Sequence, residues 1–139
     1  MAKKEIAHPD KADKNFTTGA YSAGVAADGW LFVSGQVPVN FSTGKFELGD
    51  IEHETKLTLH NVRRICEAAG CTLDDIVKCT VHLSDIKDFD RYNAVYASHF
   101  TSIKPARTTV QSVLGNGIKV EIDAIAKLPS DKKSSAGSL

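Results

Sequence analysis

The order of hydrophobic periodicities along the chain constrains its fold more than any other feature. Apolar residues recur at three- and four-residue spacing over residues 50–69 and 88–100, which predicts two amphipathic helices. Strand-like segments lie around and between these helices, at residues 21–26, 30–39, 76–83, 104–110 and 118–126. The order β-β-α-β-α-β-β predicts an α+β fold, with two helices on one face of a mostly antiparallel sheet.

Turn and capping residues mark where several of these elements begin and end. The dipeptide Asp28-Gly29 is a strong signal for a two-residue hairpin loop. Asp50 and Asp88 are placed to cap the two helices, and Gly70 is placed to end the first one. The residues expected to face the core are Thr55, Leu59, Val62, Cys66 and Ala69 in the first helix, Phe89, Tyr92, Asn93, Tyr96 and Phe100 in the second, and Val77, Cys79, Val81 and Leu83 in the strand between them.

Composition is ordinary for a globular protein, with 42% hydrophobic residues, 24% charged residues and no net charge at pH 7. A domain that follows nucleic-acid backbones usually carries an excess of Lys and Arg, so nucleic acid is not an expected partner. No apolar run reaches the roughly 18 residues that a membrane-spanning helix needs. The three cysteines form no C-x-x-C pair and fit reduced thiols, so we expect a cytoplasmic protein without membrane contact.

The length of 139 residues predicts one domain with polar ends. We expect residues 1–15 to form a loosely held N-terminal segment and residues 16–128 to form the domain. Residues 129–139 are expected to be a disordered tail.

The last two predicted strands carry the most suggestive pair of side chains, Arg107 and Glu121. Residues 115–117, Gly-Asn-Gly, have the composition of a hairpin loop, which predicts that position 107 pairs with 125. In that register Arg107, Thr109 and Glu121 share one polar face of the sheet, about 13 Å separates the arginine from the glutamate along the strands, and a neighbouring subunit could complete the site. An arginine fork can hold a small carboxylate, and a glutamate can orient a water molecule. We also expect this face, which includes Ile125, to be covered by another subunit.

Other catalytic motifs are missing. Ser34 lacks the G-x-S-x-G frame of a nucleophile elbow. The five histidines show no metal-ligand spacing, and neither a phosphate-binding loop nor G-x-G-x-x-G is present, so we expect no metal and no cofactor.

The chain resembles the Rid (YjgF, reactive intermediate/imine deaminase) family over residues 16–128. The motifs that carry the resemblance occur in the family's order: G-A-Y-S-A-G-V, F-V-S-G-Q-V-P-V, G-D-I-E-H-E-T, N-V-R-R-I-C-E-A-A-G, D-I-V-K-C-T-V, Y-N-A-V-Y, K-P-A-R-T-T-V and V-E-I-D-A-I-A. The resemblance implies a chorismate-mutase-like homotrimer with sites between subunits. It also implies hydrolysis of 2-enamino and 2-imino acids, such as 2-aminoacrylate, to 2-oxo acids and ammonia without a cofactor.

The resemblance also implies a role for individual residues. Arg107 would hold the substrate carboxylate, and Glu121 would position the attacking water. The residues that would contact the substrate are Tyr21, Ser34, Gly35, Asn93 and Thr109.

The chain departs from the family pattern near the implied site. Ala20 replaces a usual proline, Ala23 a usual glutamine, and Thr109 a cysteine that is frequent in the deaminases, while residues 112–117 replace the usual V-A-R-L-P stretch. Three alternatives to a general imine deaminase therefore stay open: a pathway-specific deaminase of the aminomuconate type, a ribonuclease, or a metabolite-binding protein without turnover.

Overall fold

The computed structural model describes residues 2–12 and 19–130, which form a six-stranded sheet, a two-stranded sheet and two α-helices. The strands are β1 (Lys4–Ile6), β2 (Gly24–Ala27), β3 (Trp30–Gln36), β4 (Val39–Asn40), β5 (Lys45–Phe46), β6 (Ile76–Leu83), β7 (Ala106–Gln111) and β8 (Val120–Lys127). The helices are α1 (Ile51–Ala68) and α2 (Phe89–Ser98), and short 3-10 turns precede β6 and α2 at Leu73–Asp75 and Ile86–Asp88.

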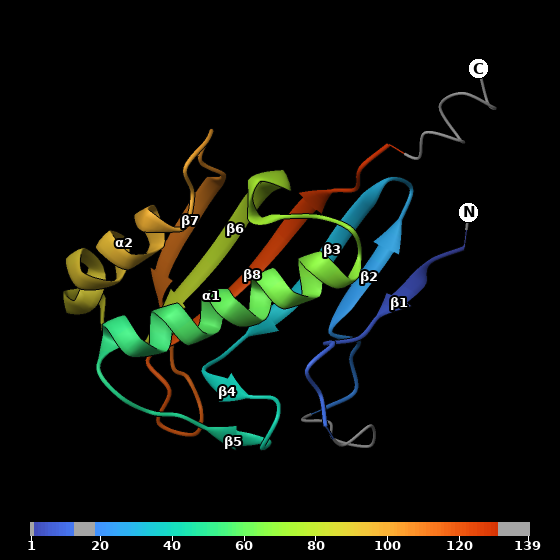
Figure 1. The fold of residues 1–139 in the computed structure, drawn as a ribbon. Coiled ribbons are helices and arrows are strands. Elements are labelled where there is room, and N and C mark those ends of the chain that lie inside the picture. The colour runs from blue at the N-terminus through green and yellow to red at the C-terminus, as the bar shows by residue number, and fades with distance from the viewer. Residues whose placement is uncertain (1, 13–18, 131–139) are drawn as a thin grey trace.

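Both helices lie on the same face of the large sheet, as Figure 1 shows. The strand order is β1-β2-β3-β8-β6-β7, and every neighbouring pair is antiparallel except β6 and β7. The predicted α+β architecture, with two helices on one face of a mostly antiparallel sheet, is confirmed. We term the face that the helices leave uncovered the open face.

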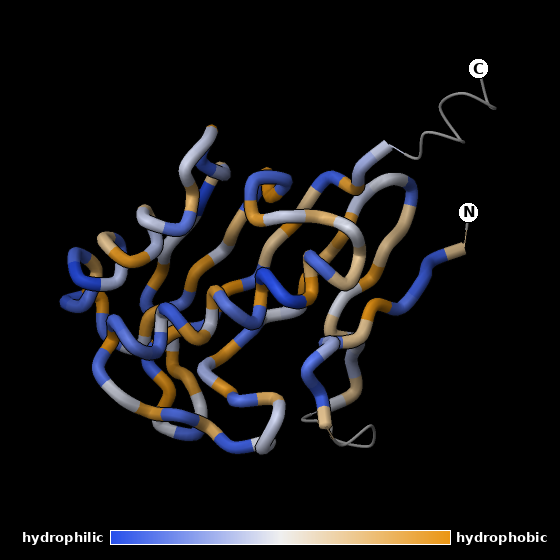
Figure 2. Tube along the Cα trace, viewed as in Figure 1, coloured by the Kyte–Doolittle hydropathy of each residue, from blue (hydrophilic) through white to orange (hydrophobic). Residues whose placement is uncertain are grey.

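The core lies between the helices and the sheet, and hydropathy alternates along the strands accordingly (Figure 2). In β8, Ile122, Ala124 and Ala126 are buried toward the helices, whereas the residues between them are half-buried on the open face. From the helix side, Leu59 and Val62 of α1 are fully buried against the sheet. This alternation leaves the open face to polar and scattered apolar side chains.

Local sequence signals account for several element boundaries. Asp28 and Gly29 have φ angles of 52° and 86°, as the predicted hairpin between β2 and β3 requires. The Asp50 side chain accepts a hydrogen bond from the His53 N–H at 2.8 Å and caps α1, and Gly70 follows its end with φ 85°. These boundaries are confirmed, whereas Asp88 precedes α2 without a side-chain capping bond.

The predicted inward stripes are largely correct. Most of these residues are buried, including Tyr92 and Tyr96 of α2 and Phe100 just after that helix. Val77 is an exception and is 44% exposed, because an irregularity in the β6–β8 ladder between Ile76 and Lys78 turns Ile76 inward instead.

The N-terminal segment is more ordered than its polar composition suggests. Lys4–Ile6 pairs with β2 as strand β1, and His8 is 3% exposed. The Arg64 guanidinium binds the Asp10 carboxylate, with its Nη2 2.9 Å from Oδ1. Residues 4–10 therefore make specific contacts with β2 and α1, while residues 13–18 and most of the predicted tail at 129–139 lie outside the described residues.

The predicted hairpin between the last two strands is wrong, because β6 lies between β7 and β8. Helix α2 carries the chain back to the other end of the sheet, so β7 runs parallel to β6 and takes the edge position. Asn116 and Gly117 do form a turn, with φ angles of 59° and 73°, but this turn belongs to a longer connection that crosses the end of β6. Two backbone bonds fix the crossing, from the Ser112 N–H to the Leu83 carbonyl and from the Ser84 N–H to the Lys119 carbonyl.

Among the described residues, none of the helices combines the length and hydropathy that crossing a membrane would require.

Candidate functional site

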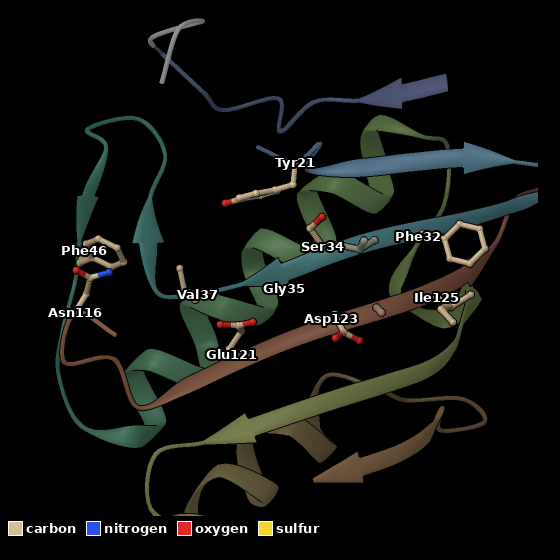
Figure 3. A pocket seen from close by; sticks show the side chains of 12 residues that line it. Tyr21, Phe32, Ser34, Gly35, Val37, Phe46, Asn116, Glu121, Asp123 and Ile125 are labelled. Atoms are coloured by element: carbon tan, nitrogen blue, oxygen red, sulfur yellow. The ribbon is translucent and has the colours of Figure 1, made fainter. Parts of the chain in front are cut away.

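The open face carries a cleft of about 700 Å³ over β3 and β8, shown in Figure 3. Four residues singled out from the sequence, Tyr21, Ser34, Gly35 and Glu121, line this cleft together. The other lining residues are Phe32, Val33, Val37, Phe46, Asn116, Asp123, Ala124 and Ile125.

Glu121 reaches across from β8 to the backbone of β3 at Gly35. A Cβ atom added to Gly35 would lie 2.9 Å from the Glu121 Cδ atom, closer than side chains pack. Between the described residues, no hydrogen bond or ion pair to the Glu121 carboxylate is formed. The carboxylate therefore faces the cleft with its oxygens available to a water molecule or a ligand.

Ser34 sits where the ladder between β3 and β8 is irregular, between Val33 and Gln36. Its hydroxyl donates to the Ser22 carbonyl at 2.6 Å, and its own carbonyl accepts from the Gln36 side-chain amide at 3.0 Å. The hydroxyl proton of Ser34 is thus held in a hydrogen bond to the backbone. This bond does not activate the serine as a nucleophile, in agreement with the missing nucleophile elbow. This bond fixes the chain of Ser22 beside Tyr21, whose side chain is 56% exposed over the cleft (Figure 3).

A buried carboxylate supports the rim of the cleft. Glu54 of α1 is fully buried and accepts hydrogen bonds from the backbone N–H groups of Gly49 at 3.0 Å and Lys119 at 2.7 Å. The Lys119 ammonium lies 3.2 Å from its Oε2 atom. Because Lys119 immediately precedes β8, this contact fixes the start of the strand that carries Glu121.

Arg107 does not lie in the cleft. In the β6–β7 ladder it is level with Cys79, and in the β6–β8 ladder Cys79 is level with Ala124, so all three point to the helix face. Glu121 is level with His82 and points to the open face. The prediction that Arg107 and Glu121 share one face is wrong, because it assumed that β7 and β8 pair directly.

Three aromatic rings of α2 surround the Arg107 guanidinium. Its Cζ atom lies 5.5, 5.4 and 4.7 Å from the ring centroids of Phe89, Tyr92 and Tyr96. One guanidinium nitrogen donates to the Asn93 side-chain oxygen at 2.7 Å. Arg107 is half-buried on the edge strand β7, so its aromatic setting fixes the direction of the fork while part of it stays accessible.

Thr109 and Asn93 belong to this second cluster rather than to the cleft. The Thr109 hydroxyl shares a hydrogen bond of 2.8 Å with the Tyr92 hydroxyl. Burial raises the pKa of Tyr92 and of Tyr96, and it raises the pKa of the Cys79 thiol to about 11. These groups are neutral near pH 7, so the cluster offers one fixed cation and no base.

The sequence placed Ile125 on this face but did not identify the other apolar and acidic residues that line the cleft. Phe32 and Ile125, which pair across β3 and β8, form its apolar part, and Asp123 adds a second carboxylate two residues from Glu121. The alternation of β8 gave a signal for Asp123 and Ile125, but the contributions of Phe46 and Asn116 come from loops that have no such pattern. Within the described residues, no three His, Cys, Asp or Glu side chains are grouped so that they could share a metal ion.

Known proteins of one family are similar to this chain in both sequence and fold. The model of the family described as Endoribonuclease L-PSP matches residues 12–128. A RutC family protein of Pyrococcus horikoshii is 42% identical over 124 residues, which cover 88% of this chain and 97% of that protein. The 2-iminobutanoate/2-iminopropanoate deaminase of Rattus norvegicus is 41% identical over 109 residues, covering 78% of this chain and 80% of the enzyme.

The fold agrees with the same group. The structure of YyfA from Yersinia pestis, described as a protein of unknown function of the conserved Rid family, matches with a TM-score of 0.83 and 38% identity. The match covers 91% of this chain and 99% of that one. The chain therefore belongs to the Endoribonuclease L-PSP family, the Rid (YjgF) proteins that its sequence motifs resemble.

Proposed function

We propose that the protein hydrolyses 2-imino and 2-enamino acids to 2-oxo acids and ammonia, at sites that two copies of the chain complete together. The observation that carries this proposal is the separation of two complementary half-sites. One half is the cleft with the Glu121 carboxylate, which forms no bond to another described side chain, and the other is the Arg107 fork on the edge strand β7. Similarity to the rat imine deaminase supports the same reaction.

The arrangement suits a reaction on a small carboxylate. A guanidinium supplied by a second copy would hold the substrate carboxylate in two parallel hydrogen bonds, which lysine cannot do as well. Such a cation would also offset the negative charge of Glu121 and Asp123 in the cleft. A closed trimer brings the same two surfaces together at each interface, because its contacts run from head to tail.

Glu121 would then orient a water molecule toward the C2 carbon of the imine. The water oxygen bonds to C2, a proton passes to the nitrogen, and ammonia leaves from the tetrahedral intermediate as the C2 carbonyl forms. A protonated imine is already electrophilic, so positioning of substrate and water accounts for the catalysis, without a strong base or a redox step.

The cleft favours this reaction over RNA cleavage. Two carboxylates, Glu121 and Asp123, line it, and they would repel a phosphate backbone. The neutral net charge of the chain gives no compensating attraction.

The test combines two inactivating variants. We expect Arg107→Ala and Glu121→Ala each to lower turnover of imines generated in situ by about 100-fold or more, because each removes one half of every site. When the two variants are unfolded, mixed and refolded together, about a quarter of the sites receive both wild-type residues from different copies, and activity returns to that level. The release of 2-oxo acid and ammonia measures turnover.

Arg91→Ala is the matched control, because it removes an exposed arginine whose hydrogen bonds, within the part of the chain that the structure describes, go to Glu52. It should leave turnover unchanged. We expect Arg107→Ala to remain folded, since it loses one hydrogen bond and contacts worth about 1–2 kcal/mol in total. Full activity of folded Arg107→Ala would overturn the assignment, and mixtures without recovered activity would overturn the shared site.

A further inference from the structure

A second cavity, of about 90 Å³, lies directly beside the cleft. The two spaces share three lining residues, Tyr21, Gly35 and Val37, so the second cavity opens from the end of the cleft where Glu121 approaches Gly35. Its outer wall is the N-terminal segment of residues 5–11, which includes Ala7, His8 and Lys11. This segment continues from β1, which pairs with β2 at the edge of the sheet (Figure 1).

The interior of the second cavity presents mainly carbon surface. Ala7, Ala23, Val37, Val39 and Phe41 contribute methyl groups and a ring. A cavity of this size has the volume of about three water molecules at ~30 Å³ each. An aliphatic chain of about three carbon atoms would fill a similar volume.

Its interior polar side chains already have partners within the protein. His8 Nε2 lies 3.0 Å from the Asn61 Oδ1 atom, and its Nδ1 accepts the Asp10 N–H at 3.1 Å. The Gln36 amide donates to the Ser34 carbonyl at 3.0 Å. A ligand group that enters therefore needs no polar atoms to satisfy these side chains.

The walls of the second cavity are held in place before any ligand arrives. The His8 ring stacks on Phe41 with centroids 3.9 Å apart, and the Asn61 amide donates to the carbonyls of Val37 and Val39 at 3.0 and 2.8 Å. Such a preformed space binds a ligand without a cost of ordering its walls.

Ala23 is a further wall residue of the second cavity, and it contributes only a short side chain. A longer side chain at this position would occupy the same space.

We infer that the second cavity is the subsite for the substrate side chain, and that it selects 2-imino acids with an aliphatic chain of about three or four carbons. This inference rests on the proposed function, because it takes the reacting carbon to lie at Glu121. The charged residues Glu5 and Lys11 retain solvent exposure, so they do not require a charged substrate chain.

The test compares imines generated in situ from alanine and from leucine. For the wild type we expect a higher kcat/KM with the leucine-derived imine. Ala23→Gln and Ala7→Leu each place a longer side chain in the second cavity, and each should lower kcat/KM for the leucine-derived imine about tenfold or more. Both variants should leave the alanine-derived imine within about twofold of wild type.

Ala94→Leu is the control, because Ala94 is exposed on α2 and lines neither the cleft nor the second cavity. Equal losses for both imines, or no loss with either cavity-filling variant, would overturn the inference. Circular dichroism and urea unfolding confirm that each variant is folded.

Binding of the product 2-oxo acids separates this inference from the proposed function. If the wild type hydrolyses neither imine, the proposed function fails, and titrations with pyruvate and 4-methyl-2-oxopentanoate still examine the cavity. Tighter binding of the longer acid, lost in Ala23→Gln, supports the subsite. Equal affinity of the wild type for the two acids contradicts it.

Discussion

At the scale of single residues, the contact between Glu121 and Gly35 defines the cleft. The Glu121 side chain can take this position because residue 35 of β3 has no side chain. A Cβ atom at position 35 would lie 2.9 Å from the Glu121 Cδ and 3.1 Å from the Glu121 Cγ atom. The glycine is needed here for close approach rather than for an unusual φ angle. The family resemblance implied Gly35 as a substrate contact, and the structure adds this positioning contact with Glu121.

We expect Gly35→Ala to displace the Glu121 carboxylate and to lower kcat about tenfold or more, because the water it orients loses its alignment. The free energy of unfolding should fall by less than about 2 kcal/mol, since the displaced group is the end of a flexible side chain. Steady-state kinetics and urea unfolding measure the two effects.

Gly115→Ala is the matched control for this change, because a Cβ there meets no atom within 4 Å. It should alter neither quantity. Unchanged kcat in folded Gly35→Ala would show that the position of Glu121 does not control turnover.

At the scale of elements, the N-terminal segment is coupled to α1 through His8. The ring is buried, and its two nitrogens are engaged by the Asn61 oxygen and the Asp10 N–H, an arrangement that requires neutral imidazole with the proton on Nε2. Burial is the main cause that lowers the pKa of His8 below 6.5, with Asp10, His60 and Arg64 as the charged and titratable neighbours. Protonation would place an Nδ1–H against the Asp10 N–H.

This coupling predicts a dependence of stability on pH. Because folding lowers the pKa of His8, the unfolded chain takes up the proton first as the pH falls through 6.5. The free energy of unfolding should be constant above this range and decrease below it, by at most about 1.4 kcal/mol per pH unit, until His8 protonates in the folded state. Hydrogen bonding to Arg64 lowers the pKa of Asp10, so that carboxylate contributes only at more acidic pH.

Urea unfolding at pH 7.5 and 5.5, at one protein concentration, measures this dependence in the wild type and in His8→Gln. Glutamine can donate to Asn61 but does not titrate, so the variant should lose most of the decrease. His53→Gln, at an exposed histidine, should behave as the wild type does. The same decrease in His8→Gln would exclude His8 as its origin.

At the scale of the whole molecule, the open face combines apolar and charged groups, as a surface that binds a second copy of the chain would. Phe32 is 46% exposed and pairs with Ile125 across β3 and β8, next to the carboxylates of Glu121 and Asp123. The Arg107 fork lies on the helix face of the edge strand, and so one chain presents both surfaces that a head-to-tail contact needs.

We expect the wild type to associate as a trimer and Phe32→Glu to dissociate it. The new carboxylate would lie in the same cleft as Asp123 and Glu121, and its burial in an interface would be unfavourable. Sedimentation or light scattering should show a mass of three 15.0 kDa chains for the wild type and of one chain for the variant.

Ile103→Glu is the control for this change, since Ile103 is 88% exposed in the loop before β7. It should leave the mass unchanged. A wild-type monomer, or a trimer that Phe32→Glu leaves intact, would contradict the role assigned to the open face.

The sequence by itself determined the local structure and the family. The helical stripes, the cap at Asp50 and the hairpin at Asp28-Gly29 depend on neighbours within a few residues, and the chain carries those signals directly. The grouping of Tyr21, Ser34, Gly35 and Glu121 in one cleft followed from the resemblance of whole motifs. Strand β1 and the buried His8 escaped prediction, because their partners in β2 and α1 lie many residues away.

Only the tertiary structure decided which strands pair and which face Arg107 occupies. A Gly-Asn-Gly turn between two strands is compatible with a hairpin, but the α2 crossover places β7 beside β6 and leaves the central position to β8. Pairing depends on contacts between distant segments: β8 buries alternate residues and bonds to a strand on each side, whereas the more polar β7 is tolerated at the edge. Because β7 pairs with β6 rather than with β8, Arg107 lies against the aromatic rings of α2 and Glu121 lies in the open cleft. The two residues are therefore on opposite faces of the same sheet.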